Sequence, residues 1–556
     1  MVKELKQVSI IPIGGVGDVT RNMYLYEYKD EILIVDCGLG FADETMLGID
    51  LLLPDIKYLL QTNKKIMGMC ISHGHEDHMG GLPFLLSSLL SKNPFPLYAS
   101  PLTAAFANRK LKEFSVSTLV QPIQFENPQV VMGSFKVDFI RVTHSVPDTS
   151  HLFIQTPIGN FYHGSDFKFD DTPWDGKISN YQKIQDGRKK GILCLLSDCL
   201  GTERFGKSLS EMPIYDSFEK IMSNATGRVI ITTYSSHVGR LNQIVQAAIK
   251  TKRKICFVGR SLTEAKDNAR RLGYMVFDNN MEVPIDQLKS IIDKELVLIV
   301  AGSQGQENSA MARIVSGDRK EIKLTKDDTV VFSSDPIPGN ELLVNALIDA
   351  IYRKGATVFY PRIHDFLHVS GHGYREDLKK LIRLTNPRKM IPIGGNYRHM
   401  ALYKEMVSEV GRSKKDVLLL EDGQEVIFNP TGVKFGRKIP VRHVFVDEIT
   451  GEELESYVLR DRQKLSESGV IIVMVEVDSE NGQLVNPPDI LARGFILENK
   501  KVVKRLEKEL TKIFSKKRGF VTNWGYTRKL VGEVSERIVF QELRRRPLVL
   551  PIVVEV

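Results

Sequence analysis

The sequence predicts an α/β protein of several domains, and three observations predict it. The chain has 556 residues, which is the length of several ordinary domains. Short apolar runs alternate with helical stretches from about residue 8 to 210, and again from about 211 to 350. The C-terminal part instead opens on one long apolar run, residues 469–478. This order of elements predicts layered α/β units followed by a small α+β domain.

The predicted boundaries follow these changes of pattern. Residues 1–210 form the first layered unit. Residues 211–350 form a second unit with a parallel sheet, because the apolar runs 254–259, 296–300 and 329–333 follow one another with helical stretches between them. The charged segment 436–465 is predicted as a linker, and residues 466–556 as a small C-terminal domain.

The most informative motif is Ser-His-Gly-His-Glu-Asp-His at residues 72–78. It follows the apolar run 66–71, which predicts a buried strand, and precedes Gly80–Pro83, which predicts a helix start. Imidazole and carboxylate groups at a strand-to-helix loop are ligands for a divalent metal, zinc first. His73 and His75 can bind one metal, and Asp77 and His78 a second. The alternative is a histidine-rich surface loop, which chance does not favour in a chain with 12 histidines.

Further ligands are expected at later strand ends. His144 follows the alternating run 135–140. Asp166 ends the segment 161–166, which follows another strand-like run. A lone histidine at a strand end is more often structural, but the order of these residues after the first motif favours ligation. We therefore expect His144 to complete the first metal site and Asp166 to bridge both metals. Asp36, at the end of another apolar strand, is better placed to accept a hydrogen bond from a ligating imidazole.

In these residues the chain resembles the metallo-β-lactamase superfamily, and within it the β-CASP nucleases of the ribonuclease J family. The resemblance covers nearly the whole chain and consists of many short matches in the right order. They are Gly14–Asp18, Val35–Gly38, Met46–Asp50, His73–His78, His144, Asp166–Asp170, Ser197–Asp198, Val258–Ser261, Gly302–Gly305, Pro336–Glu341 and His368–His372.

The resemblance implies a metallo-β-lactamase αββα sandwich with an inserted β-CASP α/β domain. The insert is the unit at residues 211–350, and residues 351–435 return to the first domain. A small α+β domain then ends the chain.

The resemblance also implies a mechanism, in which metal-activated water attacks the phosphorus of an RNA phosphodiester. Asp77 then takes part in catalysis, His372 is the candidate general acid, and Asp198 orients or tunes that histidine. Two zinc ions are expected, with manganese or magnesium as alternatives, and a separate calcium site maps to Gly48, Asp50 and Asp447. The substrate-binding residues would be Ser235, Ser236, His237, His368, Val369, Ser370, Gly371 and His372.

Members of the resembling family cut RNA internally and also degrade it from the 5′ end, favouring a 5′-monophosphate. We therefore expect endonuclease and 5′-to-3′ exonuclease activity in rRNA processing and mRNA decay. A homodimer or homotetramer and contacts with other RNA-decay proteins are also expected. Residue spacing itself does not distinguish RNA from DNA.

One position departs from the family pattern. Residues 391–399 match the family's Pro-Val-His-Gly-Glu-Tyr-Arg-His, but Gly394 stands where the family has a metal-ligating histidine, and Asn396 where it has glutamate. Glycine has no ligand atom, so we expect a weaker second metal site. This sustains an alternative, a weakly active or inactive paralogue that serves as an RNA-binding subunit of a ribonuclease complex. A small-ester or thioester hydrolase on the same metal fold is a third reading.

Composition narrows the protein class only slightly. No run of about eighteen apolar residues is present and the N-terminus lacks a secretory pattern, so we expect a cytoplasmic protein without a membrane span. Five cysteines, mostly in apolar runs, predict reduced core residues. The net charge of +8 is mild for this length. Many of the lysine and arginine residues are concentrated in the stretch 500–546. That stretch is either a solvated helix face or a surface that faces phosphates.

Overall fold

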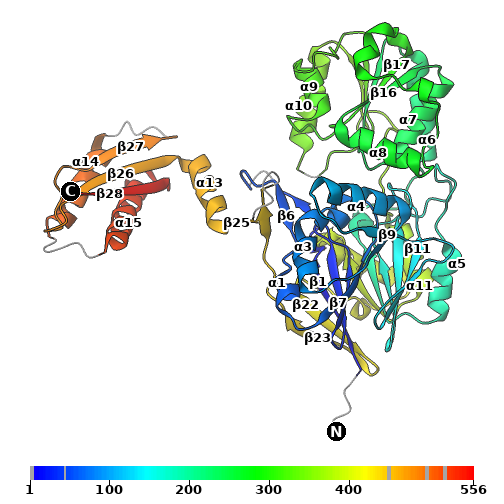
Figure 1. Cartoon of the computed structure of the whole chain (residues 1–556), viewed down its shortest axis with the longest axis horizontal. Coiled ribbons are helices and arrows are strands. Elements are labelled where there is room, and N and C mark those ends of the chain that lie inside the picture. Colours follow the sequence, from blue (N-terminus) through cyan, green and yellow to red (C-terminus); the bar gives the residue numbers. More distant parts are fainter. Residues whose placement is uncertain (1–5, 43–45, 338, 448–452, 495–499, 517–522) are drawn as a thin grey trace. The chain divides into compact units, whose positions relative to one another are not determined.

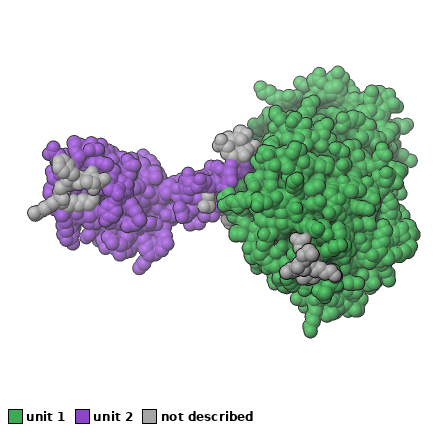
Figure 2. All heavy atoms as spheres, turned by 60° about the horizontal axis from the view of Figure 1, so that its bottom comes forward, with its two compact units in different colours: residues 1–41, 52–444 green, residues 42–51, 445–556 purple. Residues whose placement is uncertain are grey.

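A computed structural model of the chain describes residues 6–42, 46–337, 339–447, 453–494, 500–516 and 523–556. It divides into two compact units, residues 1–41 with 52–444 and residues 42–51 with 445–556 (Figure 2). Each unit is described by itself.

The first unit contains a sandwich of two sheets with helices on its outer faces (Figure 1). The sheets face each other across one apolar core, in which the rings of Tyr26 and Phe161 lie 5.9 Å apart. The first sheet has the order β23 (Gly432–Lys438), β22 (Gln424–Asn429), β1 (Val8–Gly14), β3 (Met23–Tyr28), β4 (Glu31–Val35), β7 (Lys65–Ile71), β8 (Leu97–Ala99) and β9 (Val120–Pro122). The second has the order β10 (Gln129–Met132), β11 (Phe135–Arg141), β12 (Ser150–Thr156), β13 (Gly159–Gly164), β14 (Cys194–Asp198) and β20 (Lys389–Ile393).

Helices flank both sheets of the sandwich. α3 (Leu82–Lys92) and α4 (Pro101–Glu113) lie beside the first sheet, whereas α5 (Tyr181–Lys189) and α11 (Arg375–Thr385) lie beside the second (Figure 1). The predicted αββα sandwich is therefore confirmed. The remaining short elements of this unit are β2 (Val16–Gly17), β5 (Gly40–Phe41), β6 (Leu51–Leu53), α1 (Lys57–Gln61), α2 (Glu76–Met79), β21 (Gly395–Asn396) and α12 (Tyr397–Met406).

The inserted domain is built on a parallel sheet, as its sequence pattern predicts. The strand order is β16 (Lys254–Val258), β17 (Leu296–Val300), β15 (Val229–Thr232), β18 (Thr329–Phe332) and β19 (Thr357–Phe359). One apolar cluster joins the sheet to α6 (Met212–Asn224), α7 (Val238–Lys250) and α8 (Arg260–Arg271), and a second joins it to α9 (Ala310–Ser316) and α10 (Glu341–Arg353).

After the insert the chain returns to the sandwich through α11 and then β20. This strand pairs in parallel with β14, so that Asp198 lies beside Ile393. The C-terminal ends of β13, β14 and β20 therefore meet at one edge of the second sheet. This register carries Asp166, Asp198 and Gly394 to the same edge, because each residue ends or follows one of those strands.

The second unit contains a three-stranded sheet in the order β27 (Asp489–Arg493), β26 (Val470–Val477) and β28 (Leu548–Glu555). α14 (Lys500–Phe514) and α15 (Trp524–Leu543) share one apolar cluster with the sheet. The predicted linker, residues 436–465, holds β24 (Val444–Val446), β25 (Glu453–Leu454) and the start of α13 (Ser456–Ser468). α13 is rich in charged residues, which is why its sequence resembles a linker. No helix in the described parts of either unit combines the length and apolarity that crossing a bilayer requires.

Candidate metal centre

Strand ends from both sheets bring the predicted ligands together. β4 and β7 are parallel neighbours, so Asp36 lies beside the loop that begins at Ser72, and the backbone N–H of Asp36 donates to Cys70. His144 follows β11, and Asp166 follows β13. Residues separated by as many as 93 positions thus surround one point, as the sequence predicts for the imidazoles and for Asp166.

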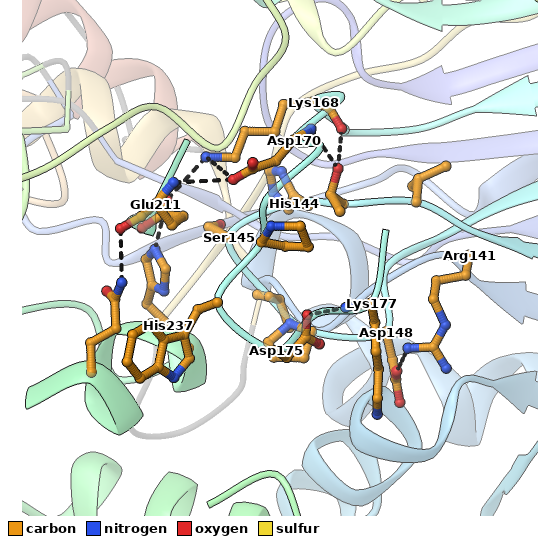
Figure 3. Close-up of a pocket in the computed structure, with 18 residues that line it drawn as sticks. Arg141, His144, Ser145, Asp148, Lys168, Asp170, Asp175, Lys177, Glu211 and His237 are labelled. Carbon is orange, nitrogen blue, oxygen red and sulfur yellow. Dashed lines mark hydrogen bonds and ion pairs between the residues drawn. The ribbon is translucent and has the colours of Figure 1, made fainter. Parts of the chain in front are cut away.

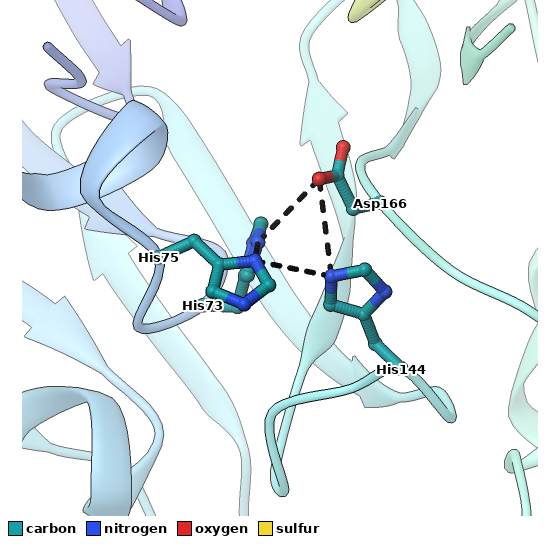
Figure 4. A group of neighbouring side chains, drawn as sticks. All are labelled: His73, His75, His144 and Asp166. Atoms are coloured by element: carbon teal, nitrogen blue, oxygen red, sulfur yellow. Dashed lines mark hydrogen bonds and ion pairs between the residues drawn. The ribbon is translucent and has the colours of Figure 1, made fainter. Parts of the chain in front are cut away.

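The first ligand set is His73, His75, His144 and Asp166 (Figure 4). His75 Nδ1 lies 3.1 Å from His73 Nε2 and 3.2 Å from His144 Nε2. Asp166 Oδ2 lies 3.6 Å from His73 Nε2 and 3.9 Å from His144 Nε2. Tetrahedral zinc with bonds of ~2.0–2.1 Å separates its nitrogen ligands by about 3.3 Å, so these donors fit a zinc-sized ion.

The protonation states of the imidazoles also fit a metal. Burial lowers the pKa of His75 to about 3 and lowers those of His73 and His144 well below the ordinary value. His144 Nδ1 lies 2.7 Å from the carbonyl oxygen of Gly371 and must donate to it. That proton leaves Nε2 of His144 with a free lone pair, directed at the other ligands.

The second ligand set is Asp77, His78 and Asp166. His78 Nε2 lies 3.7 Å from Asp77 Oδ2 and 3.4 Å from Asp166 Oδ2. On the other side of the ring, His78 Nδ1 lies 2.7 Å from Asp36 Oδ2. Although burial opposes it, the surrounding carboxylates raise the pKa of His78 well above its usual value. Asp166 belongs to both sets, which is the bridging position expected for it.

Gly394 lies beside the second set without contributing to it. A Cβ atom at this position would lie 3.6 Å from Asp166 Oδ1 and 4.0 Å from Asp198 Oδ1. Its φ of +64° is in the left-handed region that favours glycine. His399 does not fill the gap, because its Nδ1 accepts from the Asn396 N–H and its Nε2 lies 3.3 Å from Glu203.

A second histidine–aspartate pair borders the two candidate ligand sets. His372 Nδ1 lies 2.8 Å from Asp198 Oδ2, and its Nε2 lies 3.8 Å from Asp166 Oδ2. Although burial opposes it, Asp198 and Asp166 raise the pKa of His372 to about 9. Asp166, Asp198 and His372 also form a third group whose ligand atoms are close enough to hold an ion.

The loop that carries His372 is fixed by a close approach. A Cβ atom on Gly371 would lie 2.8 Å from His144 Cε1 and 3.0 Å from Ser145 Oγ, so only glycine fits there. Ser370 Oγ accepts from the backbone N–H of His372 at 3.1 Å. His144, a predicted metal ligand, and the loop of His372 are therefore held against each other.

The other residues predicted to bind substrate differ in exposure. Ser235, Ser236 and Ser370 are partly exposed, whereas Val369 and His237 are buried. His237 caps α7, where its Nδ1 accepts from the Arg240 N–H at 3.2 Å. Its Nε2 lies 3.5 Å from Glu211. The structure thus places His237 in a buried charge network.

That network was not predicted from the sequence. Glu211 pairs with Arg240 and, at 3.1 Å, with Lys168, and all three side chains are almost fully buried. Arg240 also donates to the carbonyl oxygen of Leu367 at 3.0 Å, next to His368. A cavity of about 50 Å³ lies beside these charges and is lined by His144 as well (Figure 3). Single charged residues spaced far apart along the chain give no sequence signal of such a network.

Two further features concern ligands. Asn22, which the sequence analysis did not single out, has its Nδ2 atom 3.2 Å from His78 Nε2. At the predicted calcium site, the carbonyl oxygen of Gly48 accepts a hydrogen bond from the Arg462 guanidinium. The site at Gly48, Asp50 and Asp447 stays a prediction.

Known protein families match four segments of the chain. The description "Metallo-beta-lactamase superfamily" matches residues 16–188, and "Ribonuclease J, beta-CASP domain" matches residues 226–351. "Zn-dependent metallo-hydrolase RNA specificity domain" matches residues 359–419, and "Ribonuclease J C-terminal domain" matches residues 457–556. A solved structure from Enterococcus faecalis V583, a protein of unknown function, shares the fold with a TM-score of 0.56 and 16% identity, over 76% of this chain and 100% of that one.

Curated relatives match over almost the whole chain. "Ribonuclease J2" of Bacillus subtilis is 32% identical over 564 residues, which cover 100% of both chains. "Ribonuclease J" of Thermus thermophilus is 33% identical and covers 99% of this chain and 95% of its own. "Ribonuclease J 1" of Streptococcus pyogenes is 35% identical over 88% of this chain and 87% of its own. With these matches and this fold, the chain belongs to the ribonuclease J family.

Proposed function

We propose that the chain is a zinc-dependent ribonuclease that cuts RNA phosphodiesters internally and also degrades RNA from its 5′ end. One observation carries the proposal. The unprotonated nitrogens of His73, His75 and His144 converge with Asp166, and His372 lies 3.8 Å from that same carboxylate. Membership of the ribonuclease J family supports RNA as the substrate.

His73, His75, His144 and Asp166 would hold one metal, and Asp77, His78 and Asp166 the second. Bound there, divalent metals supply Lewis acidity, which lowers the pKa of water and withdraws charge from a phosphate. Zinc suits the imidazole-rich first set, with manganese or magnesium as alternatives. Asp36 would orient His78 by accepting from its Nδ1 at 2.7 Å.

The remaining groups would handle the substrate and the proton. His372, with a pKa raised to about 9, is protonated at neutral pH and can donate to the leaving oxygen. Asp198 holds the ring by accepting from Nδ1, so Nε2 carries the proton toward the site. The partly exposed Ser370, Ser235 and Ser236 offer hydroxyl donors to RNA phosphates.

We also propose the substrate preference, the cellular role and the assembly state from membership of the family. A 5′-monophosphate would be preferred, and rRNA processing and mRNA decay in the cytoplasm would be the cellular roles. A homodimer or homotetramer, further RNA-decay proteins and a structural calcium ion at Gly48, Asp50 and Asp447 belong to the same proposal.

The test is cleavage of one RNA sequence in three forms, 5′-monophosphorylated, 5′-triphosphorylated and circular, by purified full-length chain with zinc or manganese. Cleavage of the circle supports endonuclease action, and faster loss of the 5′-monophosphorylated form supports 5′ exonuclease action. Turnover of thioesters but not of RNA would contradict the proposal.

A second candidate function is favoured by Gly394. Since this residue offers the second metal no ligand, the chain could instead be a weakly active RNA-binding subunit of a ribonuclease complex. Tight RNA binding without cleavage in the same assay would support this candidate. Against it, every other predicted ligand is present and converges.

A further inference from the structure

Phe205 is a large apolar side chain that the fold leaves in solvent. Its side chain is 80% exposed, more than any other large hydrophobic residue among the described parts of the chain. It lies just after the short helix Leu200–Glu203, which follows β14 and Asp198. A single exposed phenylalanine is ordinary on a protein surface, so what the ring can do depends on the groups around it.

The ring is held in place. The Arg375 guanidinium lies 4.8 Å from the centre of the Phe205 ring and is itself ion-paired with Glu409. Arg375 is only 12% exposed, so it covers one face of the ring and leaves the other to solvent. The backbone is fixed as well, because the N–H of Arg375 donates to Arg204 and that of Glu376 to Gly206, both at 3.0 Å.

The residue before Phe205 in the chain, Arg204, is an exposed cation. The exposed Arg204 stacks over Tyr374, with its guanidinium 5.4 Å from the ring centre and Nη1 3.5 Å from the hydroxyl oxygen. Among the described residues, no carboxylate lies within ion-pairing distance of this guanidinium. Arg204 can therefore bind an external anion, whereas the guanidinium of Arg375 is already paired with Glu409.

Two links connect Arg204 and its stacking partner Tyr374 with the candidate catalytic loop. Tyr374 is two residues from His372 in the chain. Arg204 is close enough to Asp335 to lower the pKa of that carboxyl, although burial raises that pKa overall. Asp335 in turn lies 4.0 Å from His368. Tyr374 in the chain and Asp335 in space therefore link Arg204 to the loop of His368 and His372.

We propose that Arg204, Phe205, Tyr374 and Arg375 form a binding site for single-stranded RNA. One base stacks on the free face of Phe205 while an adjacent phosphate pairs with Arg204, and Arg375 only positions the ring. Aromatic stacking of this kind tolerates any base and suits a single strand rather than a duplex. The inference rests on the proposed function and names one contact of its substrate.

The test measures RNA affinity and kinetics on the full-length chain. Binding of a fluorescein-labelled 20-nucleotide oligouridine is followed by anisotropy in an Asp77→Ala background, which prevents cleavage. Phe205→Ala should weaken binding about tenfold, and Phe205→Trp should restore it. Arg204→Ala should lower the slope of log affinity against log salt by about one. The matched control is Phe435→Ala, because Phe435 is also exposed (56%) but lies on β23.

Kinetics separate binding from a structural role. With Asp77 unchanged, Phe205→Ala should raise KM for the same oligonucleotide, while kcat should stay within about twofold of the parent value. A contact that is equally strong in the ground state and in the transition state affects KM alone. Equal RNA affinity in Phe205→Ala and the parent would overturn the inference. The inference would also be overturned if Phe205→Ala changed the oligomeric state, measured by light scattering, and left the RNA affinity unchanged. The ring would then pack on a second copy of the chain. If the parent binds and cleaves no RNA, the proposed function itself fails.

Discussion

Asp36 Oδ2 lies 2.7 Å from His78 Nδ1, although 42 residues separate the two in the chain. Asp36 is fully buried and also accepts from the Ser72 N–H at 2.7 Å and from the Ser72 hydroxyl at 2.9 Å. Because Oδ2 of Asp36 accepts a hydrogen bond at Nδ1, that nitrogen of the ring carries a proton. Nε2 of His78 therefore faces Asp77 and Asp166, and it is the nitrogen that a metal would bind after losing its proton.

Asp36→Asn should weaken zinc binding about 10- to 100-fold, because an amide fixes the ring of His78 less firmly. Titration with a competing chelator measures the affinity. Asp186→Asn is the control, since Asp186 is a half-exposed carboxylate on α5 and belongs to neither ligand set. An unaltered zinc affinity in Asp36→Asn would show that the hydrogen bond does not orient the ligand.

Chelator treatment should abolish RNA cleavage, and added zinc should restore it. In Asp77→Ala and in His78→Ala, restoration should fail, because each change removes a ligand atom of the second set. Cleavage rate and bound zinc, measured by elemental analysis, are the two readouts. Full activity of both variants would exclude the second set from catalysis.

Gly394→His should convert a weak second zinc site into a tight one. The Cβ position faces Asp166 at 3.6 Å, so an imidazole there can reach the second metal. The left-handed backbone at +64° costs a non-glycine residue about 1–2 kcal/mol, a cost that metal binding can offset. Isothermal titration with zinc should show two tight sites in the variant, with Gly394→Ala as the control for backbone strain. The same two affinities in the parent and in Gly394→His would refute the asymmetric centre.

Asp198→Asn should move the alkaline limb of the pH–rate profile to lower pH. Asp198 helps to raise the pKa of His372 to about 9, so its neutralisation lowers that pKa by about one unit or more. The acid form of His372 is present below its pKa and is lost as the pH rises through it. In the variant, the loss of activity with rising pH should therefore begin at a lower pH than in the parent. Profiles from pH 6 to 10 test this, and an unmoved limb would argue against His372 as the general acid.

Glu211→Gln should lower stability, because it leaves the buried Arg240 and Lys168 without their counter-ion. Breaking a buried pair in this way costs about 3–5 kcal/mol. Although burial raises it, Arg240 and Lys168 hold the pKa of Glu211 well below its usual value. The stabilisation is thus present above the unfolded pKa of ~4.3 and is lost as the pH falls toward the folded one. Thermal unfolding at pH 7 should show a lower midpoint for Glu211→Gln, but not for the exposed control Glu321→Gln.

Sequence reasoning succeeded where chemistry is local. The motif at residues 72–78 follows a strand with an apolar pattern, so both its residue types and its position at a strand end were readable. It failed for Glu211, Arg240 and Lys168, since burial of a charged side chain depends on partners 29 and 43 residues away. The charged helix α13 likewise resembled a linker.

By itself the sequence determined the kinds of ligand atom, their order along the chain and the absence of an imidazole at residue 394. Only the tertiary structure decided that Nδ1 of His75 lies within hydrogen-bonding distance of nitrogens of both His73 and His144, and that Phe205 stays exposed. The reason is physical: such distances are set by parallel strand register and by core packing between residues far apart in sequence, which no local pattern encodes.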